Sequence, residues 1–489
     1  MNNEELSFSM PEALRKCLPA HISVIAADDN NYTQSTATWN IRVQYQPVAV
    51  VQPTTVDDVS LIIKSAKNIG ISQVAVRGGS HSFEGLSLGG RNGAMVIDMV
   101  KMNHVCSDPG KSELTAQGGA LLSQVHTEAH HTGRKMVPLG TCPSVGLAGQ
   151  IQSGGYGFYS RTYGPLVDRA IAFEMVTADG QILHVDKDHH ADLFYAVRGS
   201  GTGSFGVITS VTLRTNDIPA SIANFSVIWK LSNSEIPHIF KRLQAACLWA
   251  PKSINTMVMA WVEKFEVFGT ILASSHSERD TIWAEFLASL PESSDVRMVP
   301  MDYLESVMDI SKRQTSAPWY NSLSEIQREG KQHLRYMKIK SGYIPDPLPD
   351  DAIERIGAYL TTQPPTGVRV QLLALDPEHV PQPDHTSIRA RRCHWLMGMS
   401  VYITQREHQE NELLSEGDKR MPWLNQAYNL FLPFASGAYI GDDDLEEGED
   451  ESSLFLSFYG SHLPRLSSIK AKYDPANLFH HPLSIPLPK

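Results

Sequence analysis

The feature that most constrains this chain is a series of glycine-rich turns between Arg77 and Gly206. Backbone N–H groups can approach an anionic phosphate only where no Cβ blocks them, so glycine loops that follow strands are candidate diphosphate sites. Three such loops occur, at residues 77–85 (RGGSHSFEG), 140–157 and 201–206. The N-terminal part of the chain is therefore the expected location of a ligand site.

The third loop, Gly201-Thr-Gly203-Ser-Phe-Gly206, has the formal GxGxxG spacing of a dinucleotide site. That motif signals a Rossmann unit only where a strand precedes it and a helix follows it. Here the β-type run VITSVTL follows at residues 207–213. The sequence therefore does not support a Rossmann fold.

The rest of the pattern predicts an α+β protein. The chain has 489 residues, and at roughly 150 residues per domain this favours two or three domains. Short strands and helices alternate up to about residue 214, with strands expected at 48–51, 73–76 and 94–97 and a helix at 56–67. Between about 221 and 436 the pattern changes to longer strands (254–262, 265–272) and amphipathic helices (235–248, 278–290), which predicts an antiparallel sheet backed by helices.

The net charge and the lack of visible targeting signals bear on the partners and location expected for this protein. Acidic residues outnumber basic ones by 53 to 42, giving a net charge of −11, which disfavours nucleic-acid binding. We expect neither a signal peptide nor a membrane span, and therefore an intracellular, cytoplasmic location. Eight acidic residues crowd positions 442–451, a run that we interpret as a solvated, mobile loop.

Cysteine and histidine usage indicates no metal site. The five cysteines are too scattered for a disulfide framework or a zinc site, so most are expected to be buried thiols. His126 and His130 have an i, i+4 spacing, but the order HTEAH is not that of HExxH and no third ligand is in view. His81, at the end of the first loop, could be a hydrogen-bond donor, a general base or a covalent attachment point. The second loop could be either a ligand site or a set of close-packed turns.

Taken together, the motifs resemble the berberine bridge enzyme-like FAD oxidases of the vanillyl-alcohol oxidase/p-cresol methylhydroxylase superfamily. The resemblance rests on several ordered segments and extends from about residue 40 to the C-terminus: 76–85, 140–157, 192–207, 337–341 and 459–479. It implies a two-domain FAD-binding fold of the vanillyl-alcohol oxidase type. Residues 1–216 and 437–489 would form the FAD-binding domain, and 217–436 a substrate domain with an antiparallel sheet and helices.

The resemblance also implies a cofactor site. By analogy, FAD is held covalently at two points, by His81 at the flavin C8α methyl and by Cys142 at flavin C6. Val145 matches the position that controls access of O2 to the flavin. The other implied cofactor-binding residues are Arg77, Gly78, Gly79, Ser80, Gly85, Gly146, Gly149, Gly154, Gly157 and Val207.

The implied catalytic machinery departs from the family pattern. The late Tyr-x-Asn-Tyr motif, whose second tyrosine often acts as a base, reads Tyr439-Ile-Gly-Asp442 here. A catalytic strand glutamate of some members aligns near Trp395, beside His394. Oxidation of a C–H bond often requires removal of an O–H or N–H proton, and the candidate bases are Asp442, His394 and Tyr439. Phe83, Tyr163 and Trp395 are the candidate substrate contacts.

The function implied is an FAD-linked oxidase that takes hydride from a small hydrophobic natural-product intermediate, as in oxidative cyclisation during secondary metabolism. O2 would be the acceptor and H2O2 the product. The expected partners are the small-molecule substrate and O2, with no nucleic acid and no membrane. The alternatives are a flavin-containing scaffold for a non-redox cyclisation, a carbohydrate or alcohol oxidase of the same family, and a dehydrogenase with another acceptor.

Overall fold

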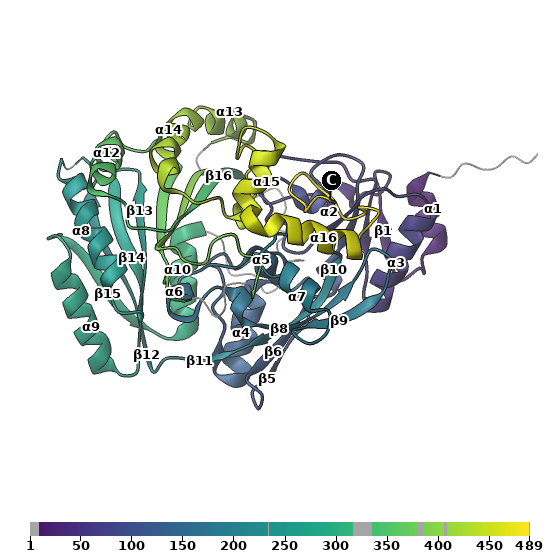
Figure 1. Ribbon diagram of the computed structural model, residues 1–489, viewed down its shortest axis with the longest axis horizontal. Coiled ribbons are helices and arrows are strands. Elements are labelled where there is room, and N and C mark those ends of the chain that lie inside the picture. The colour runs from purple at the N-terminus through teal and green to yellow at the C-terminus, as the bar shows by residue number, and fades with distance from the viewer. Residues whose placement is uncertain (1–8, 233, 316–334, 380–384, 405–407, 489) are drawn as a thin grey trace, which may run out of the picture.

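The computed structural model describes residues 9–232, 234–315, 335–379, 385–404 and 408–488. Two sheet-based regions lie side by side, and the C-terminal helices cross the junction between them (Figure 1). The predicted α+β class is confirmed. The domain boundaries at 216 and 436 stay predictions.

The N-terminal region is built on two larger sheets and a small ribbon. The first sheet has the order β1 (Ser23–Ile25), β2 (Ala49–Gln52), β4 (Met95–Asp98), β3 (Val74–Arg77), with β2, β4 and β3 parallel. The second has the order β5 (Val105–Asp108), β6 (Glu113–Gln117), β10 (Val207–Arg214), β8 (Ala170–Val176), β9 (Ile182–Asp186). A two-stranded ribbon joins β7 (Lys135–Met136) to β11 (Asn216–Asp217).

Helices of this region close the loops between strands. The helix α3 (Val56–Asn68) begins at Thr55, whose side chain accepts from the Asp58 N–H in a capping box, as such a start signal predicts. It agrees with the predicted helix to within one residue. The others are α1 (Met10–Cys17), α2 (Tyr32–Ser35), α4 (Leu122–Gly133), α5 (Leu147–Ser153), α6 (Ser160–Tyr163) and α7 (Ala191–Ala196).

The middle of the chain forms a seven-stranded antiparallel sheet. Its order is β15 (Asp295–Met301), β12 (Ser221–Lys230), β14 (Lys264–Ala273), β13 (Ile254–Trp261), β17 (Val368–Ala374), β18 (Trp395–Thr404), β16 (Arg335–Ile344). The hairpin β13–β14 matches the two strands predicted there. Because side chains alternate along a strand, one face of this sheet meets helices and the other faces the N-terminal region.

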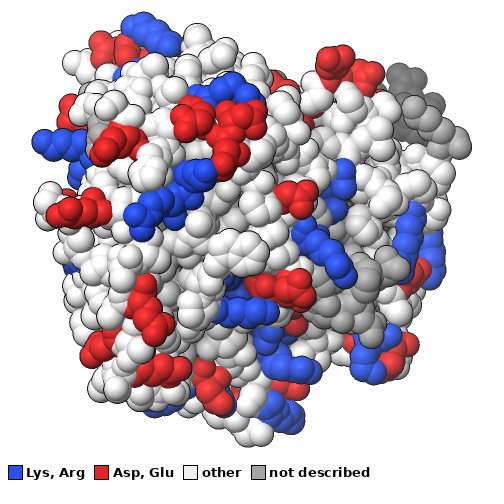
Figure 2. Space-filling view, turned by 60° about the vertical axis from the view of Figure 1, so that its left-hand side comes forward, with Lys and Arg blue, Asp and Glu red and all other residues white. Residues whose placement is uncertain are grey.

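The outer face of the seven-stranded sheet is covered by helices that share one apolar core with it. These are α8 (Ile236–Trp249), α9 (His276–Ser289), α12 (Asp350–Leu360), α13 (Leu413–Asp418) and α14 (Met421–Phe431). The helix α10 (Tyr303–Thr315) packs against β12 and α4. On the face shown in Figure 2, acidic and basic side chains are interspersed rather than gathered into one patch.

The C-terminal segment returns to the N-terminal region. The helices α15 (Glu451–Tyr459) and α16 (Leu463–Tyr473) lie across its front (Figure 1), and α16 packs against α7. The Lys470 ammonium is fully buried and donates to the carbonyl oxygens of Ser204 and Phe479 at 2.7 and 2.6 Å. Among the described residues, no helix combines the length and apolar character that crossing a bilayer requires.

Candidate active site

A cavity of about 390 Å³ lies between the seven-stranded sheet and the glycine loops. The first glycine loop (residues 77–85, after β3) and the second glycine loop (residues 140–157, before and along α5) form its floor. The inner faces of β16, β17 and β18 form its roof, with Ile339, Gln371, Leu373, Leu396 and Tyr402 among the lining side chains. Large, mostly apolar cavities with a few polar groups are the usual place for cofactors and substrates.

The two glycine loops touch through their backbones. A Cβ on Gly79 would collide with the backbone nitrogen of Gly146, and a Cβ on Gly146 would collide with that of Gly79. Only glycine permits this approach. Gly78, Gly79, Ser80, Gly146, Gly149 and Gly157 all line the cavity, so it has a wall of backbone suited to an extended polar cofactor.

The side chains of His81 and Cys142 converge on one hydroxyl group. Ser144 Oγ lies 2.7 Å from His81 Nε2 and 3.4 Å from Cys142 Sγ, and both residues line the cavity. The His81 ring also packs on Trp39, with ring centroids 5.0 Å apart. Two potential attachment points from different loops are therefore held together at one place in the cavity.

His81 is neutral at physiological pH. Its ring lines the cavity and is otherwise enclosed by protein, so burial, with a contribution from the nearby Arg335 guanidinium, lowers its pKa to about 3. With Nε2 directed at Ser144, the other ring nitrogen, Nδ1, is available for a bond to a ligand. A neutral imidazole in this setting can act as a nucleophile.

Asp442 is the lining carboxyl group best suited to accept a proton. It lies in the short helix η7 (Ile440–Asp442) and is half-buried. Burial raises its pKa to about 7, and the neighbouring Asp443 and Asp444 add to this, while a hydrogen bond from the Ser341 hydroxyl opposes it. A pKa near the working pH is what a general base requires.

Tyr439 also lines the cavity, but its environment suits a different role. Its hydroxyl oxygen accepts a hydrogen bond from the Gly155 N–H at 3.3 Å, and its ring packs edge-on against Tyr156. Burial raises its pKa well above the ordinary value, with Asp442 and Tyr156 contributing. The hydroxyl therefore stays protonated at neutral pH and fixes the second glycine loop.

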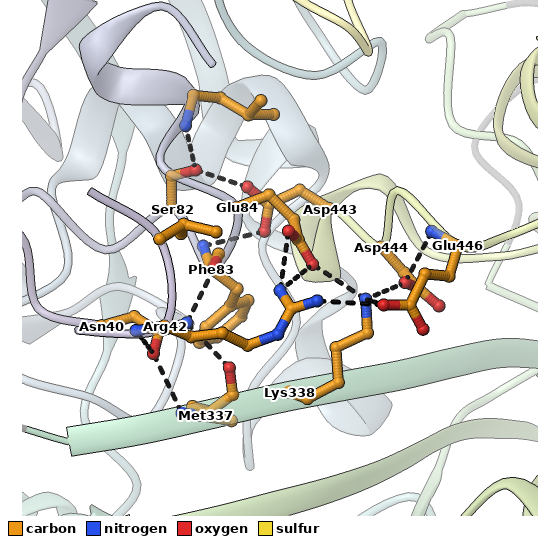
Figure 3. Close-up of polar contacts among 12 residues, drawn as sticks. Asn40, Arg42, Ser82, Phe83, Glu84, Met337, Lys338, Asp443, Asp444 and Glu446 are labelled. Carbon is orange, nitrogen blue, oxygen red and sulfur yellow. Dashed lines mark hydrogen bonds and ion pairs between the residues drawn. The ribbon is translucent and has the colours of Figure 1, made fainter. Parts of the chain in front are cut away.

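The acidic run beside Asp442 is partly a buried structure, which corrects the prediction of a solvated loop for its first residues. Asp443 is 6% exposed and Asp444 is 3% exposed. Asp444 can be buried because its carboxylate contacts Lys338 (Figure 3) and because the Lys340 ammonium lies 2.9 Å from its other oxygen. The exposed character begins only at Glu446.

We name the side chains around Lys338 the charge network: Arg42, Glu84, Lys338, Lys340, Asp444 and Glu446. Lys338 donates to Glu84 at 2.9 Å and to Asp444, and Arg42 donates to both Glu84 oxygens at 2.8 Å (Figure 3). Burial alone would raise the pKa of Asp444, but the two lysines outweigh it and hold that pKa below the ordinary value. The network thus joins the first glycine loop, β16 and the C-terminal segment.

Four of the predicted cofactor residues lie outside the cavity lining. Arg77 is fully buried on β3 and forms an ion pair with Asp98 of β4 at 2.6 Å, so it holds the sheet together. Gly85 and Gly154 adopt positive φ angles of 67° and 115° at the start of a 3₁₀ turn and the end of α5, which makes them turn residues. Val207 is buried and pairs with Val176, while its neighbours Gly206 and Ile208 line the cavity.

Three predicted catalytic or substrate residues are likewise displaced. His394 places Nδ1 2.6 Å from the Pro345 carbonyl oxygen, to which it donates, away from the cavity. Trp395 is fully buried on the helix side of β18, and its indole N–H points to Gln244. Leu396, one position further, lines the cavity instead, as the alternation of side chains requires. Tyr163 packs with Tyr159 and Tyr303 in a separate cluster.

The remaining predicted residues lie at the cavity: His81, Cys142, Val145, Phe83, Asp442 and Tyr439, with the six loop residues named above. Residues that the sequence reasoning missed include Ser144, Asp443 and Gln371. Ser144 was within the second loop and could have been found as the neighbour of Cys142. His126 is also buried, with Nδ1 2.6 Å from the Tyr303 hydroxyl.

Comparison with known proteins identifies the class. Residues 47–186 match the FAD-binding domain family, and residues 438–486 match the family described as berberine and berberine like. The chain is 26% identical to the FAD-linked oxidoreductase dpmaF of Metarhizium anisopliae over 97% of this chain and 91% of that protein. It is 27% identical to berberine bridge enzyme-like 28 of Arabidopsis thaliana over 90% and 85%, respectively.

Solved structures agree on the fold. Berberine bridge enzyme-like 28 superposes with a TM-score of 0.83 at 25% identity, covering 98% of this chain and 100% of the other. A structure of glucooligosaccharide oxidase from Acremonium strictum, studied for its 6-S-cysteinyl, 8α-N1-histidyl FAD, has a TM-score of 0.81 at 22% identity and covers 97% and 99%.

The protein is therefore an FAD-binding oxidoreductase with the vanillyl-alcohol oxidase type of fold. Within that class, its C-terminal segment matches the berberine and berberine like family, and it resembles berberine bridge enzyme-like 28 along most of its length. The predictions of fold, FAD and oxidoreductase activity are confirmed. The wall of glycine backbone and the paired His81 and Cys142 fit this cofactor.

Proposed function

We propose that this protein is an oxidase that holds FAD through two covalent bonds, from His81 Nδ1 and Cys142 Sγ, and oxidises an apolar alcohol. The observation that carries this proposal is that His81 and Cys142, which both line the cavity, meet at Ser144 Oγ. The glucooligosaccharide oxidase named above carries the same two types of linkage, which supports the assignment.

When bound, the flavin would accept hydride from a substrate carbon and pass the electrons to O2, giving H2O2. The protein supplies the rest. Asp442 accepts the proton of the substrate hydroxyl, which favours loss of hydride from the adjoining carbon. The half-buried Val145 lines the cavity, and a small side chain at that position leaves room for O2.

The proposed substrate class is supported by the side chains that line the cavity. Ile339, Leu373, Leu396 and Phe83 offer apolar surface, and Gln371 supplies a polar anchor. This supports a small hydrophobic substrate of the kind found in natural-product pathways. A second candidate is an oligosaccharide, because several relatives are named as oligosaccharide oxidases.

Acid precipitation tests the covalent bonds. We expect the native pellet to stay yellow, His81→Ala and Cys142→Ala each to retain flavin through the remaining bond, and the double variant to lose it to the supernatant. Cys106→Ala, at an exposed cysteine, is the matched control and should behave as the native protein. A colourless native pellet would refute the proposal.

Two probes separate the substrate classes. Cinnamyl alcohol represents an apolar allylic alcohol, and xylobiose represents an oligosaccharide; peroxide is measured with each in air. Peroxide from cinnamyl alcohol alone supports the proposal, and peroxide from xylobiose alone favours the second candidate. A scaffold for non-redox cyclisation would leave the flavin absorbance unbleached when its substrate is added without O2.

A further inference from the structure

Asp443 connects the two sides of the proposed active site. Its carboxylate accepts hydrogen bonds from the Ser82 hydroxyl at 2.5 Å and the Phe83 N–H at 3.0 Å. Both donors belong to the turn that directly follows His81 in the first glycine loop. Asp443 itself directly follows Asp442. One buried side chain thus spans the distance between the attachment loop and the helix that carries the proposed base (Figure 3).

The backbone at Asp443 is held in an unusual conformation. Its φ of 29° is positive, which is uncommon for a residue with a side chain. The Ser82 oxygen that donates to it also accepts from the Leu86 N–H at 2.7 Å, so the turn is fixed at both ends. Such a conformation persists where the surroundings determine it, as these bonds do.

The charge network also links the first glycine loop to the C-terminal segment. Lys338 bridges Glu84 of the first glycine loop and Asp444 of the C-terminal segment, and Lys340 adds a second contact to Asp444. The network contains three cations and three carboxylates that contact one another. The groups that bind Asp443 are instead a hydroxyl and an amide N–H, which are neutral donors.

We propose that Asp443 is a positioning residue: it fixes the turn after His81 against η7, and its negative charge governs proton uptake by Asp442. This inference rests on the proposed function, in which Asp442 is the base. The two carboxyl groups belong to consecutive residues, and a negative charge on Asp443 makes ionisation of Asp442 harder.

Among the described residues, few charged or titratable groups lie around Asp442. Within its own segment they are Asp443, Asp444 and the Tyr439 hydroxyl, and from β16 they are Lys338 and Lys340, whose contacts go to Asp444. Ser341 of β16 adds a neutral donor. The helix α5, which also packs against η7, has the sequence LAGQIQS and contributes no titratable side chain. Asp443 is therefore the neighbour whose removal should change Asp442 most directly.

Two variants separate charge from position. Asp443→Asn keeps the shape, since its amide oxygen can still accept from Phe83 and its NH2 group can donate to Ser82. Asp443→Ala removes both bonds. Asp450→Asn is the matched control, because it makes the same charge change at an exposed helix cap and its amide oxygen can still accept from the Ser453 N–H.

Infrared titration of protonated carboxyl groups needs no substrate. The native protein should show two carboxyl groups that titrate near neutrality. In Asp443→Asn one remains, titrating about one pH unit lower, and covalent flavin content is unchanged. In Asp443→Ala the fraction of acid-stable flavin falls by about half or more, because the His81 turn loses its anchor. Asp450→Asn should match the native protein in both measurements.

The inference is overturned if the remaining group in Asp443→Asn titrates at the native pH, or if Asp443→Ala keeps its full covalent flavin. Failure of the proposed function has a different signature. If Asp442→Asn turns over substrate as the native protein does, Asp442 is not the base, while the shift in Asp443→Asn still reports the coupling between the two groups.

Discussion

Replacement of Asp442 by asparagine should separate cofactor binding from catalysis. The side chain lies at the cavity, and asparagine has nearly the same shape, so the fold and covalent flavin should be retained. What is lost is the ability to accept a proton. A positioned base typically contributes about 10²–10⁴-fold, and we expect kcat/KM to fall by that factor.

The pH dependence gives the sharper signature. Because the pKa of Asp442 is raised to about 7, the native base is protonated and inactive below that pH and becomes available above it. The native kcat/KM should therefore rise about tenfold per pH unit up to neutrality and then level off. In Asp442→Asn this limb should disappear, leaving a low rate that does not vary over the same range.

The rate of H2O2 production is measured from about pH 5 to about pH 9. The substrate is whichever probe the protein oxidises, cinnamyl alcohol or xylobiose. Pellet colour after acid precipitation, measured in parallel, confirms that the variant carries flavin. A matched control is Asp346→Asn, outside the cavity lining on the loop after β16. If Asp442→Asn retains the limb near neutrality with full flavin content, another group titrates and the assignment of the base is refuted.

Three further results are expected. Ser144→Ala should lower the acid-stable flavin fraction because His81 and Cys142 lose the oxygen between them, whereas Ser144→Thr should keep it. Glu84→Gln removes the buried carboxylate that pairs with Arg42 and Lys338, and it should lower the unfolding free energy by about 3–5 kcal/mol. The control, Glu449→Gln at an exposed position, should change it by less than about 0.5 kcal/mol. Chemical denaturation measures both. Leu396→Ala should change KM and also cost some stability, because Leu396 lines the cavity but is buried, whereas Trp395→Ala should cost about 3–5 kcal/mol by leaving a hole in the helix-side core.

Much of the fold could be predicted because its signals are local. The hairpin β13–β14 follows from two runs of strand-forming residues, and α3 follows from its capping box and apolar spacing. The rejection of a Rossmann unit at residues 201–206 also held, since β10 follows that turn directly. Each of these depends on neighbours in sequence, which is where composition and spacing are informative.

Positions that depend on register were harder to predict. Trp395 and Leu396 differ by one residue, yet one faces helices and the other faces the cavity, because successive side chains on a strand point to opposite faces. The glycines show a related problem. Gly79 and Gly146 are required where two loops meet, whereas Gly85 and Gly154 are required for positive φ angles, and sequence alone does not distinguish these causes.

The acidic run shows what long-range contacts add. Asp442, Asp443 and Asp444 are chemically identical in the sequence, and a solvated loop is the ordinary interpretation of such a run. The lysines that contact Asp444 are 106 and 104 residues earlier in the chain, on the edge strand β16. They stabilise the ionised form of Asp444. Because both lysines contact Asp444, Asp443 accepts hydrogen bonds from neutral donors, and Asp442 lines the cavity. The same side-chain type therefore has three roles: a buried ion-pair partner, an anchor for the His81 turn, and a carboxyl group that exchanges a proton near neutrality. Only the surroundings differ: the lysines that hold Asp444 ionised come from β16, so long-range packing sets the roles of the three carboxyl groups.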